Sequence, residues 1–93
     1  MAYKIFIKPS ACKDLDSYPD SEVMKISSKL MHLQEEPRPI GIQKLTDKEG
    51  YRIRIGNYRV LYQINDASRH IYIYRIKHRK DVYKWFLIIK THL

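Results

Sequence analysis

The sequence has little of what several common classes of protein require. Its single cysteine, Cys12, excludes an intrachain disulfide, and its three glycines stand apart, so no glycine-rich loop is available to cradle a phosphate. The longest apolar run, residues 85–89, is far shorter than the roughly 20 residues that span a bilayer. No Cys-x-x-Cys or His-Glu-x-x-His metal motif occurs, and no signal peptide precedes the first β-rich segment. We therefore expect one cytoplasmic domain over residues 1–93, without membrane span, metal or cofactor.

Acidic residues are scarce in the second half of the chain. Residues 1–49 hold eight Lys/Arg and eight Asp/Glu, so their net charge is 8 − 8 = 0, whereas residues 50–93 hold ten and two, which gives 10 − 2 = +8. Two carboxylates are too few for a two-metal nuclease in this half. Such one-sided basic charge is typical of proteins that bind nucleic acid, although a basic surface can also serve solubility alone.

The segment at residues 51–62 predicts a β-hairpin, because β-rich residues alternate on both sides of Gly56-Asn57, a two-residue turn signal. In that register Arg54 lies directly opposite Arg59. One face of the hairpin then carries Arg52, Arg54 and Arg59. The other face carries Ile53, Val60 and Tyr62. Like charges opposite one another destabilise a sheet, so this concentration of arginines indicates a face that holds an anion.

Alternation and helical spacing divide the rest of the chain into elements. We expect strands at residues 3–8, 51–55, 58–64 and 70–77, two helices that meet at Pro19, a loop at 35–41, an extended piece at 43–45 and a terminal helix from 80. The apolar stripe of the second helix is expected to be core, and comprises Val23, Ile26, Leu30 and Leu33. The order β-α-α-β-β-β-α predicts an α+β fold, a small and mostly antiparallel four-stranded sheet with a helical hairpin on one face and a short C-terminal helix. The hairpin arginines then point to the open face, because the Ile53 side must face the helices.

The residues on and near this face suit chemistry at a phosphate. Guanidinium groups match phosphate oxygens bidentately, and the candidates are Arg52, Arg54, Arg59 and Arg79. His78 can exchange a proton near neutral pH, and Tyr83 follows Arg79 at helical spacing. This set suits metal-free RNA cleavage, in which a 2′-hydroxyl attacks the adjacent phosphate with help from a base, an acid and cations. A free tyrosine, with a pKa of about 10, would be a poor base unless nearby arginines favoured its phenolate.

Residues 51–62 (YRIRIGNYRVLY) and 75–83 (RIKHRKDVY) resemble the RelE toxins of the RelE/ParE superfamily, and the likeness spans essentially the whole chain. The resemblance implies a RelE-like fold and a type II toxin that cleaves mRNA in the ribosomal A site. It also implies a cognate antitoxin that forms a hetero-oligomer with the toxin. That antitoxin would be partly acidic and would fold on binding.

The resemblance also implies roles for individual residues. Arg59 matches the arginine that stabilises the transition state, Arg79 the arginine at the leaving group, and Tyr83 the tyrosine proposed as base. His78 lies where many members have histidine, so it is an alternative for proton transfer. The basic residues expected to contact the RNA phosphates are Arg52, Arg54, Lys77 and Lys80. Relatives often have lysine at the first two of these positions, so arginine there argues against lysine-based proton transfer.

Two other functions stay open on the sequence. A ParE-like toxin would inhibit DNA gyrase by binding and would cut nothing, because a shared fold does not fix function. A degenerate member would keep only antitoxin or DNA binding. The arginine face, Arg79 and Tyr83 favour the nuclease. The apolar run at residues 85–89 is expected either to pack on the sheet or to be covered by the antitoxin.

Overall fold

The computed structural model describes residues 2–45 and 50–81, which form one sheet and the helices that cover it. The elements, in chain order, are β1 (Lys4–Ile7), α1 (Pro9–Asp16), α2 (Asp20–Leu30), the 3₁₀ helix η1 (Met31–Gln34), β2 (Gln43–Lys44), β3 (Tyr51–Ile55), β4 (Tyr58–Asn65) and β5 (His70–His78). These elements confirm the predicted α+β fold. Of the predicted terminal helix, only residues up to 81 are described, and residues 79–81 are helical. None of the helices in the described ranges is long and apolar enough to cross a membrane.

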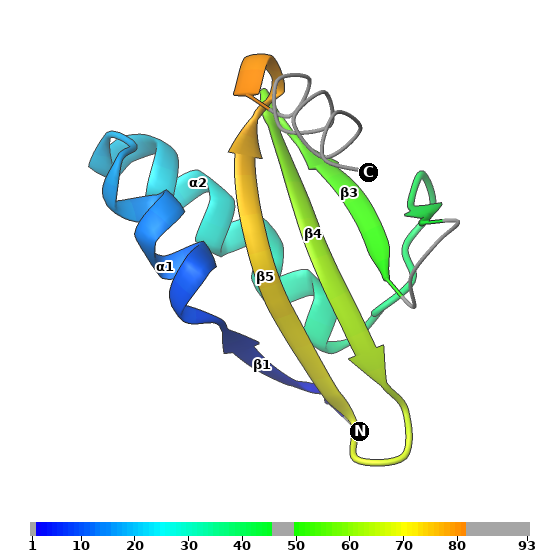
Figure 1. The fold of residues 1–93 in the computed structure, drawn as a ribbon. Coiled ribbons are helices and arrows are strands. Elements are labelled where there is room, and N and C mark those ends of the chain that lie inside the picture. Colours follow the sequence, from blue (N-terminus) through cyan, green and yellow to red (C-terminus); the bar gives the residue numbers. More distant parts are fainter. Residues whose placement is uncertain (1, 46–49, 82–93) are drawn as a thin grey trace, which may run out of the picture.

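The sheet has five strands, in the order β1-β5-β4-β3-β2, so the predicted count of four is wrong. The additional strand is β2, which pairs Gln43 with Arg52 and Lys44 with Tyr51. Two residues are too few to show an alternating pattern, which is why the sequence indicated only an extended piece there. The β1–β5 pair is parallel and the other pairs are antiparallel, as Figure 1 shows for the long central strands.

The core lies between the sheet and the helices, and Figure 1 shows α2 passing behind β4 and β5. Its buried residues are Ala11, Ile26, Leu30, Leu33, Tyr58, Val60, Tyr62, Ile71, Ile73 and Ile76. Three of the four residues of the predicted helical stripe are among them, and Val23 is half-buried. Ile53 packs against the same cluster. The opposite face of the hairpin, which carries the arginines, is therefore turned away from the helices, as predicted.

Beyond the point where β1 ends, side chains of α1 and of the segment after it form hydrogen bonds with the outer edge of β5. The Ser10 hydroxyl donates to a β5 carbonyl at 2.6 Å, and the Asp14 carboxylate accepts the backbone N–H of Ile76 at 2.9 Å. The Tyr18 hydroxyl donates to the carbonyl of Ile76 at 2.8 Å and accepts the N–H of His78 at 3.2 Å. Ser10 and Asp14 lie on one face of α1, because they are spaced four residues apart, and Tyr18 follows two residues after the helix ends at Asp16. They replace a strand as hydrogen-bond partner, so β5 continues in order as far as His78.

A polar cluster ties the start of the chain, the loop after η1 and the β4–β5 turn together. The guanidinium of Arg38 donates to both carboxylate oxygens of Asp66, at 3.1 and 2.8 Å, and to the hydroxyl of Tyr51 at 3.0 Å. The hydroxyl of Tyr3 donates to Asp66 at 2.7 Å. The hydrogen bond from Arg38, followed by that from Tyr3, lowers the pKa of Asp66 to about 2. Asp66 is thus an anion whose charge is already matched within the protein.

Candidate anion-binding site

The hairpin has the register that the sequence predicts. Arg54 pairs with Arg59 across the two strands, and Ile55 pairs with Tyr58. The next strand places Lys77 opposite Arg59, so three neighbouring strands bring three cations into one row on the open face. Gly56, the first residue of the turn, has a φ of +57°, a conformation that glycine adopts without strain.

Arg59 lies at the centre of this row, and no carboxylate of residues 2–45 or 50–81 forms an ion pair with it. Its Nη1 atom is buried and has no hydrogen-bond partner among the described residues. Burial, and then the positive charges of Arg54, Arg52 and Arg79, lower the pKa of the Arg59 guanidinium below its ordinary value. A guanidinium nevertheless stays protonated in proteins, so the site holds a cation that is partly desolvated and repelled by its neighbours. A bound anion would relieve both effects.

The neighbouring cations are held in place around Arg59. Arg54 donates through Nε to the carbonyl of Gly56 at 3.1 Å, and Arg52 donates to the side-chain oxygen of Gln43 on β2. The backbone N–H of Arg79 donates to the carbonyl of Asn57 in the hairpin turn at 2.7 Å. This contact fastens the residue after β5 to the hairpin, and it brings Arg79 close enough to influence the pKa of Arg59.

The structure therefore brings together all four arginines that were predicted for the site, Arg52, Arg54, Arg59 and Arg79. Lys77 and Lys80 are placed differently from one another. The Nζ atom of Lys77 is 3.1 Å from a carboxylate oxygen of Asp14 and the side chain is only 20% exposed, whereas Lys80 is exposed. Lys77 thus has an internal counter-ion, and its contact with RNA stays a prediction, as does that of Lys80.

His78 lies on the opposite face of the sheet from the arginine row. It pairs with Tyr58 across β4 and β5, and the two rings meet edge to face with centroids 5.3 Å apart. Tyr58 belongs to the core cluster, so this is the side that the helices cover. Side chains of successive strand residues point to opposite faces, which separates His78 from Lys77. The structure does not bring His78 to the arginine face, and its role in proton transfer stays a prediction; Tyr83 lies outside the described residues.

Sequence reasoning missed Asp14, which receives hydrogen bonds from Arg75, Lys77 and the β5 backbone. Burial raises the pKa of its carboxyl, but the hydrogen bonds, that from Arg75 being the strongest, lower the pKa below its ordinary value overall. Its sequence signal was weak, since a single Asp on a short helix is ordinarily a solvated residue. Only the packing of α1 against the edge of β5 gives it three donors.

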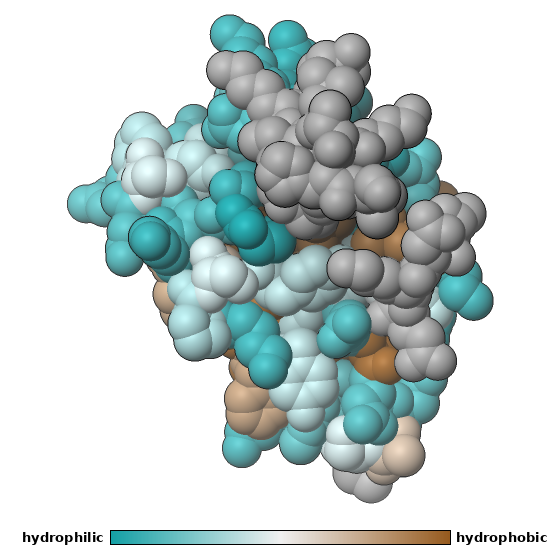
Figure 2. All heavy atoms as spheres, in the orientation of Figure 1, coloured by the Kyte–Doolittle hydropathy of each residue, from teal (hydrophilic) through white to brown (hydrophobic). Residues whose placement is uncertain are grey.

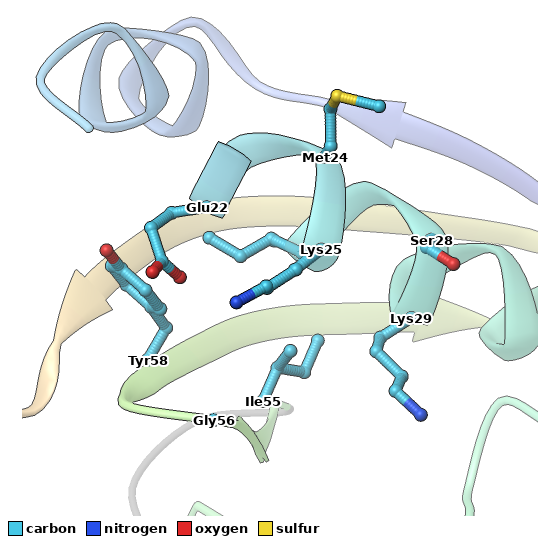
Figure 3. A pocket seen from close by; sticks show the side chains of 9 residues that line it. Glu22, Met24, Lys25, Ser28, Lys29, Ile55, Gly56 and Tyr58 are labelled. Carbon is cyan, nitrogen blue, oxygen red and sulfur yellow. The ribbon is translucent and has the colours of Figure 1, made fainter. Parts of the chain in front are cut away.

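An open groove lies on the helix side of the hairpin turn, between α2 and the ends of β3 and β4 (Figure 3). Figure 3 shows the amine of Lys25 and the carboxylate of Glu22 on the side of α2 that faces the turn, with Glu22 beside Tyr58. Burial, followed by the charge of Glu22, raises the pKa of Tyr58. The groove carries both signs of charge, unlike the arginine face. Within the described ranges, no three His, Cys, Asp or Glu side chains lie together as metal ligands.

The chain is similar in sequence to known toxins. A family model described as the ParE toxin of type II toxin–antitoxin systems, parDE, matches residues 5–83. The chain is 33% identical over 88 residues to the protein named RelE1 of Methanocaldococcus jannaschii, covering 90% of this chain and 98% of that protein. It is 29% identical over 86 residues to the toxin RelG of Mycobacterium tuberculosis, covering 90% and 99%.

Two solved toxin–antitoxin complexes contain chains of similar fold. One is the RelBE2 complex of Mycobacterium tuberculosis, with a TM-score of 0.77 at 25% identity, covering 84% of this chain and 99% of that chain. The other is the archaeal RelE–RelB complex of Pyrococcus horikoshii, with a TM-score of 0.75 at 30% identity, covering 85% and 97%.

Proposed function

The chain belongs to the ParE toxin family of type II toxin–antitoxin systems, and from this premise we propose that it is a ribosome-dependent mRNA endonuclease. The proposed reaction takes place in the ribosomal A site in the cytoplasm and inhibits translation. It needs no metal ion, because the arginines supply the positive charge that the reaction requires.

The observation that carries this proposal is the state of Arg59. A buried guanidinium nitrogen that has no partner among the described residues and lies near three further arginines is destabilising unless the site has a ligand. A phosphate diester of RNA supplies two non-bridging oxygens, which share one negative charge, in the geometry that guanidinium groups match. Arg59 is half-buried, but Arg54 and Arg79 beside it are exposed, which supports access by a strand of nucleic acid.

The proposed chemistry distributes the steps of cleavage among the site residues. The 2′-oxygen forms a bond to phosphorus while the bond from phosphorus to the 5′-oxygen breaks, which leaves a 2′,3′-cyclic phosphate and a 5′-oxyanion that takes a proton from water to become a 5′-hydroxyl. Arg59 stabilises the charge that develops on the phosphoryl oxygens, and Arg79 that on the leaving oxygen. Tyr83 is proposed to take the proton of the 2′-hydroxyl as phenolate, a form that arginines close to it would favour. His78 is the alternative for proton transfer.

We also propose that the chain binds a cognate antitoxin that is partly acidic and orders on binding. Two solved relatives of similar fold are complexes, one of RelE with RelB and one of the RelBE2 pair. The net charge of +8, all of it in residues 50–93, supports an acidic partner by charge complementarity. A hetero-oligomer of toxin and antitoxin follows from that pairing.

The description of the matching family favours one alternative, a ParE-like toxin that inhibits DNA gyrase without cutting. That function makes no use of Arg59 as a transition-state group. It predicts a response to DNA damage, with mRNA left intact, when the chain is induced. The same induction experiment therefore separates the two functions.

The test is induction of the chain in cells that lack the antitoxin, with 5′-end mapping of mRNA. The parent should produce cuts within translated codons. Arg59→Ala should reduce cleavage by about 10²-fold or more, the usual effect of removing one transition-state donor. Tyr83→Phe should also abolish growth arrest. The matched control Lys13→Ala removes an exposed positive charge from α1 and should act like the parent.

Two outcomes would contradict the proposal. Growth arrest with intact mRNA and a DNA-damage response would assign the chain to gyrase inhibition. Arg59→Ala and Tyr83→Phe chains that cut mRNA as well as the parent would show that the arginine face is not the catalytic site.

A further inference from the structure

A group of three rings, exposed at Phe6 and half-buried at His70 and Tyr72, lies on the open face at the end of β5 opposite to the arginine row. Phe6 of β1 stacks on Tyr72 of β5, with ring centroids 5.5 Å apart and planes 20° apart. The ring of His70 meets Phe6 edge to face at 4.8 Å, and its Nδ1 atom is 3.1 Å from the hydroxyl of Tyr72. Phe6 is 36% exposed. These three residues, Phe6, His70 and Tyr72, are named the aromatic platform below.

The platform faces away from the helices. Ile71 and Ile73 are fully buried in the core, so the residues that alternate with them on β5 point to the other side of the sheet. Phe6 pairs with Tyr72 in the parallel register and therefore shares its face. Figure 2 shows that the described part of this open face is mainly hydrophilic to intermediate in character, as suits a wet surface.

Two lysines flank the platform. The Nζ atom of Lys4 lies 5.7 Å from the centre of the Phe6 ring, and that of Lys8 lies 5.2 Å from the centre of the Tyr72 ring. Neither lysine forms an ion pair with a carboxylate in the part of the chain that the structure describes. The carboxylate of the adjoining turn, Asp66, is already engaged by Arg38.

Partly exposed rings next to lysines that have no carboxylate partner among the described residues are the two parts of a surface that binds single-stranded nucleic acid. Bases stack on aromatic side chains, and lysines contact the phosphates between them. Cross-strand ring pairs also stabilise a sheet, but that role does not need the flanking lysines. The pairing of β4 with β5 shifts by one residue between Leu61 and Tyr62, so Tyr72 and Lys77 share the open face although they are 77 − 72 = 5 residues apart, or about 16 Å at roughly 3.3 Å per residue. One strand of RNA could therefore reach both sites on the same face.

We infer that the aromatic platform, with Lys4 and Lys8, is a binding subsite for single-stranded RNA. It lies on the same face of the sheet as the arginine row, at the other end of β5. The platform stacks one or more bases, and the lysines contact the adjoining phosphates. The inference rests on the proposed function in naming RNA as the strand. It extends that function, because it assigns binding to residues that take no part in cleavage.

The test is fluorescence anisotropy of the full chain, without ribosomes, with a labelled single-stranded oligouridine of roughly 12 nucleotides. Phe6→Leu and Tyr72→Leu should each weaken binding about five-fold or more, because stacking on a ring is lost. Tyr72→Phe keeps the ring and should bind like the parent.

The double variant Lys4→Gln/Lys8→Gln should make the slope of log K against log salt shallower by about 1.4, or about 0.7 for each lost phosphate contact. Lys13→Gln is the matched charge control and should keep both affinity and slope.

An RNA duplex of the same length is the ligand control, because its bases are stacked inside the helix. Phe6→Leu should not change the affinity for the duplex. Far-ultraviolet circular dichroism and the midpoint of thermal unfolding establish that each variant is folded. If Phe6→Leu does not fold, Tyr72→Leu still tests base stacking, and the double lysine variant still tests the phosphate contacts.

The results separate this inference from the proposed function. Unchanged single-strand affinity in the folded platform variants, or no binding by the parent, would overturn the subsite, whatever mRNA mapping shows in cells. Loss of affinity in these variants supports the subsite even if cellular mRNA stays intact, a result that would overturn only the proposed cleavage.

Discussion

Asp14 is the residue that links the first helix to the basic strand. It is the one buried charged residue among those described, and it accepts hydrogen bonds from Arg75 and from the backbone of Ile76. Its ion pair with Lys77 draws that amine toward α1 and away from the centre of the arginine row. Asp14 therefore determines which cations on this face are left for an external anion.

Asp14→Ala should lower the free energy of unfolding by about 1–3 kcal/mol at pH 7, because the buried N–H of Ile76 loses its acceptor. Asp16→Ala is the matched control, since Asp16 is an exposed residue of the same helix, and should have little effect. Unfolding in urea measures both. Equal effects of the two substitutions would show that Asp14 does not anchor β5.

The same variant should behave differently in acid. The pKa of Asp14 is lowered in the folded protein, so its contribution to stability is present above the unfolded value of about 3.9 and is lost as the pH falls through the lower folded value. The difference between the parent and Asp14→Ala should therefore be constant near neutral pH and should shrink below about pH 4.

At the scale of elements, the hairpin turn fixes the position of the arginine row. Among the described non-glycine residues only Arg69 has a positive φ, so the turn has a left-handed residue at Gly56 but not at Asn57. Glycine first and an ordinary residue second is the pattern of a type II′ turn, which matches the twist of the two strands. The carbonyl of Asn57 also receives the N–H of Arg79, so the turn holds two segments of the site.

Gly56→Ala should destabilise the protein by about 1–2 kcal/mol, through backbone strain alone. A β-carbon at this position would meet nothing within 4 Å, whereas the φ of +57° is unfavourable for alanine. Asn57→Ala is the control at the neighbouring position and should have a smaller effect. Thermal or urea unfolding tests this pair, and a larger loss for Asn57→Ala would mean that the strain lies elsewhere in the turn.

At the scale of the whole molecule, charge is arranged for binding rather than for stability. The first half of the chain is neutral and the second half carries the entire net charge of +8. The fold pairs Asp14 and Asp66 with cations of its own, but the structure leaves Arg59 without a partner among the described residues. Functional sites commonly keep such unfavourable contacts because the ligand relieves them.

Arg59→Gln should therefore raise the free energy of unfolding by up to about 1 kcal/mol, even though it should abolish cleavage. The gain is modest because water screens a guanidinium that is only partly buried. Sulfate, as a substitute for phosphate, should raise the unfolding midpoint of the parent more than that of Arg59→Gln, because it binds the folded site. Chloride at the same ionic strength controls for screening. Equal sulfate shifts in the two chains would argue against an anion site at Arg59.

The separation of His78 from the arginines shows where reasoning from the sequence stopped. The predicted last strand ended at residue 77, whereas β5 continues to His78. Because side chains alternate along a strand, the side chain of His78 points to the face opposite to that of Lys77. The strand is longer than predicted because Tyr18 supplies hydrogen bonds to its edge, and no local pattern records a contact between residues 60 positions apart.

The sequence by itself determined the hairpin, its register and the face that the arginines share, because alternation and turn chemistry act between near neighbours in the chain. It also determined which side of the hairpin is core, since apolar residues must face the helices. Only the tertiary structure decided that Asp14 binds Lys77, that the buried Nη1 of Arg59 has no hydrogen-bond partner in the described part of the chain, and that Phe6 stacks on Tyr72. Each of these depends on how elements far apart in the chain pack together, and burial, desolvation and ion pairing exist only once that packing has formed.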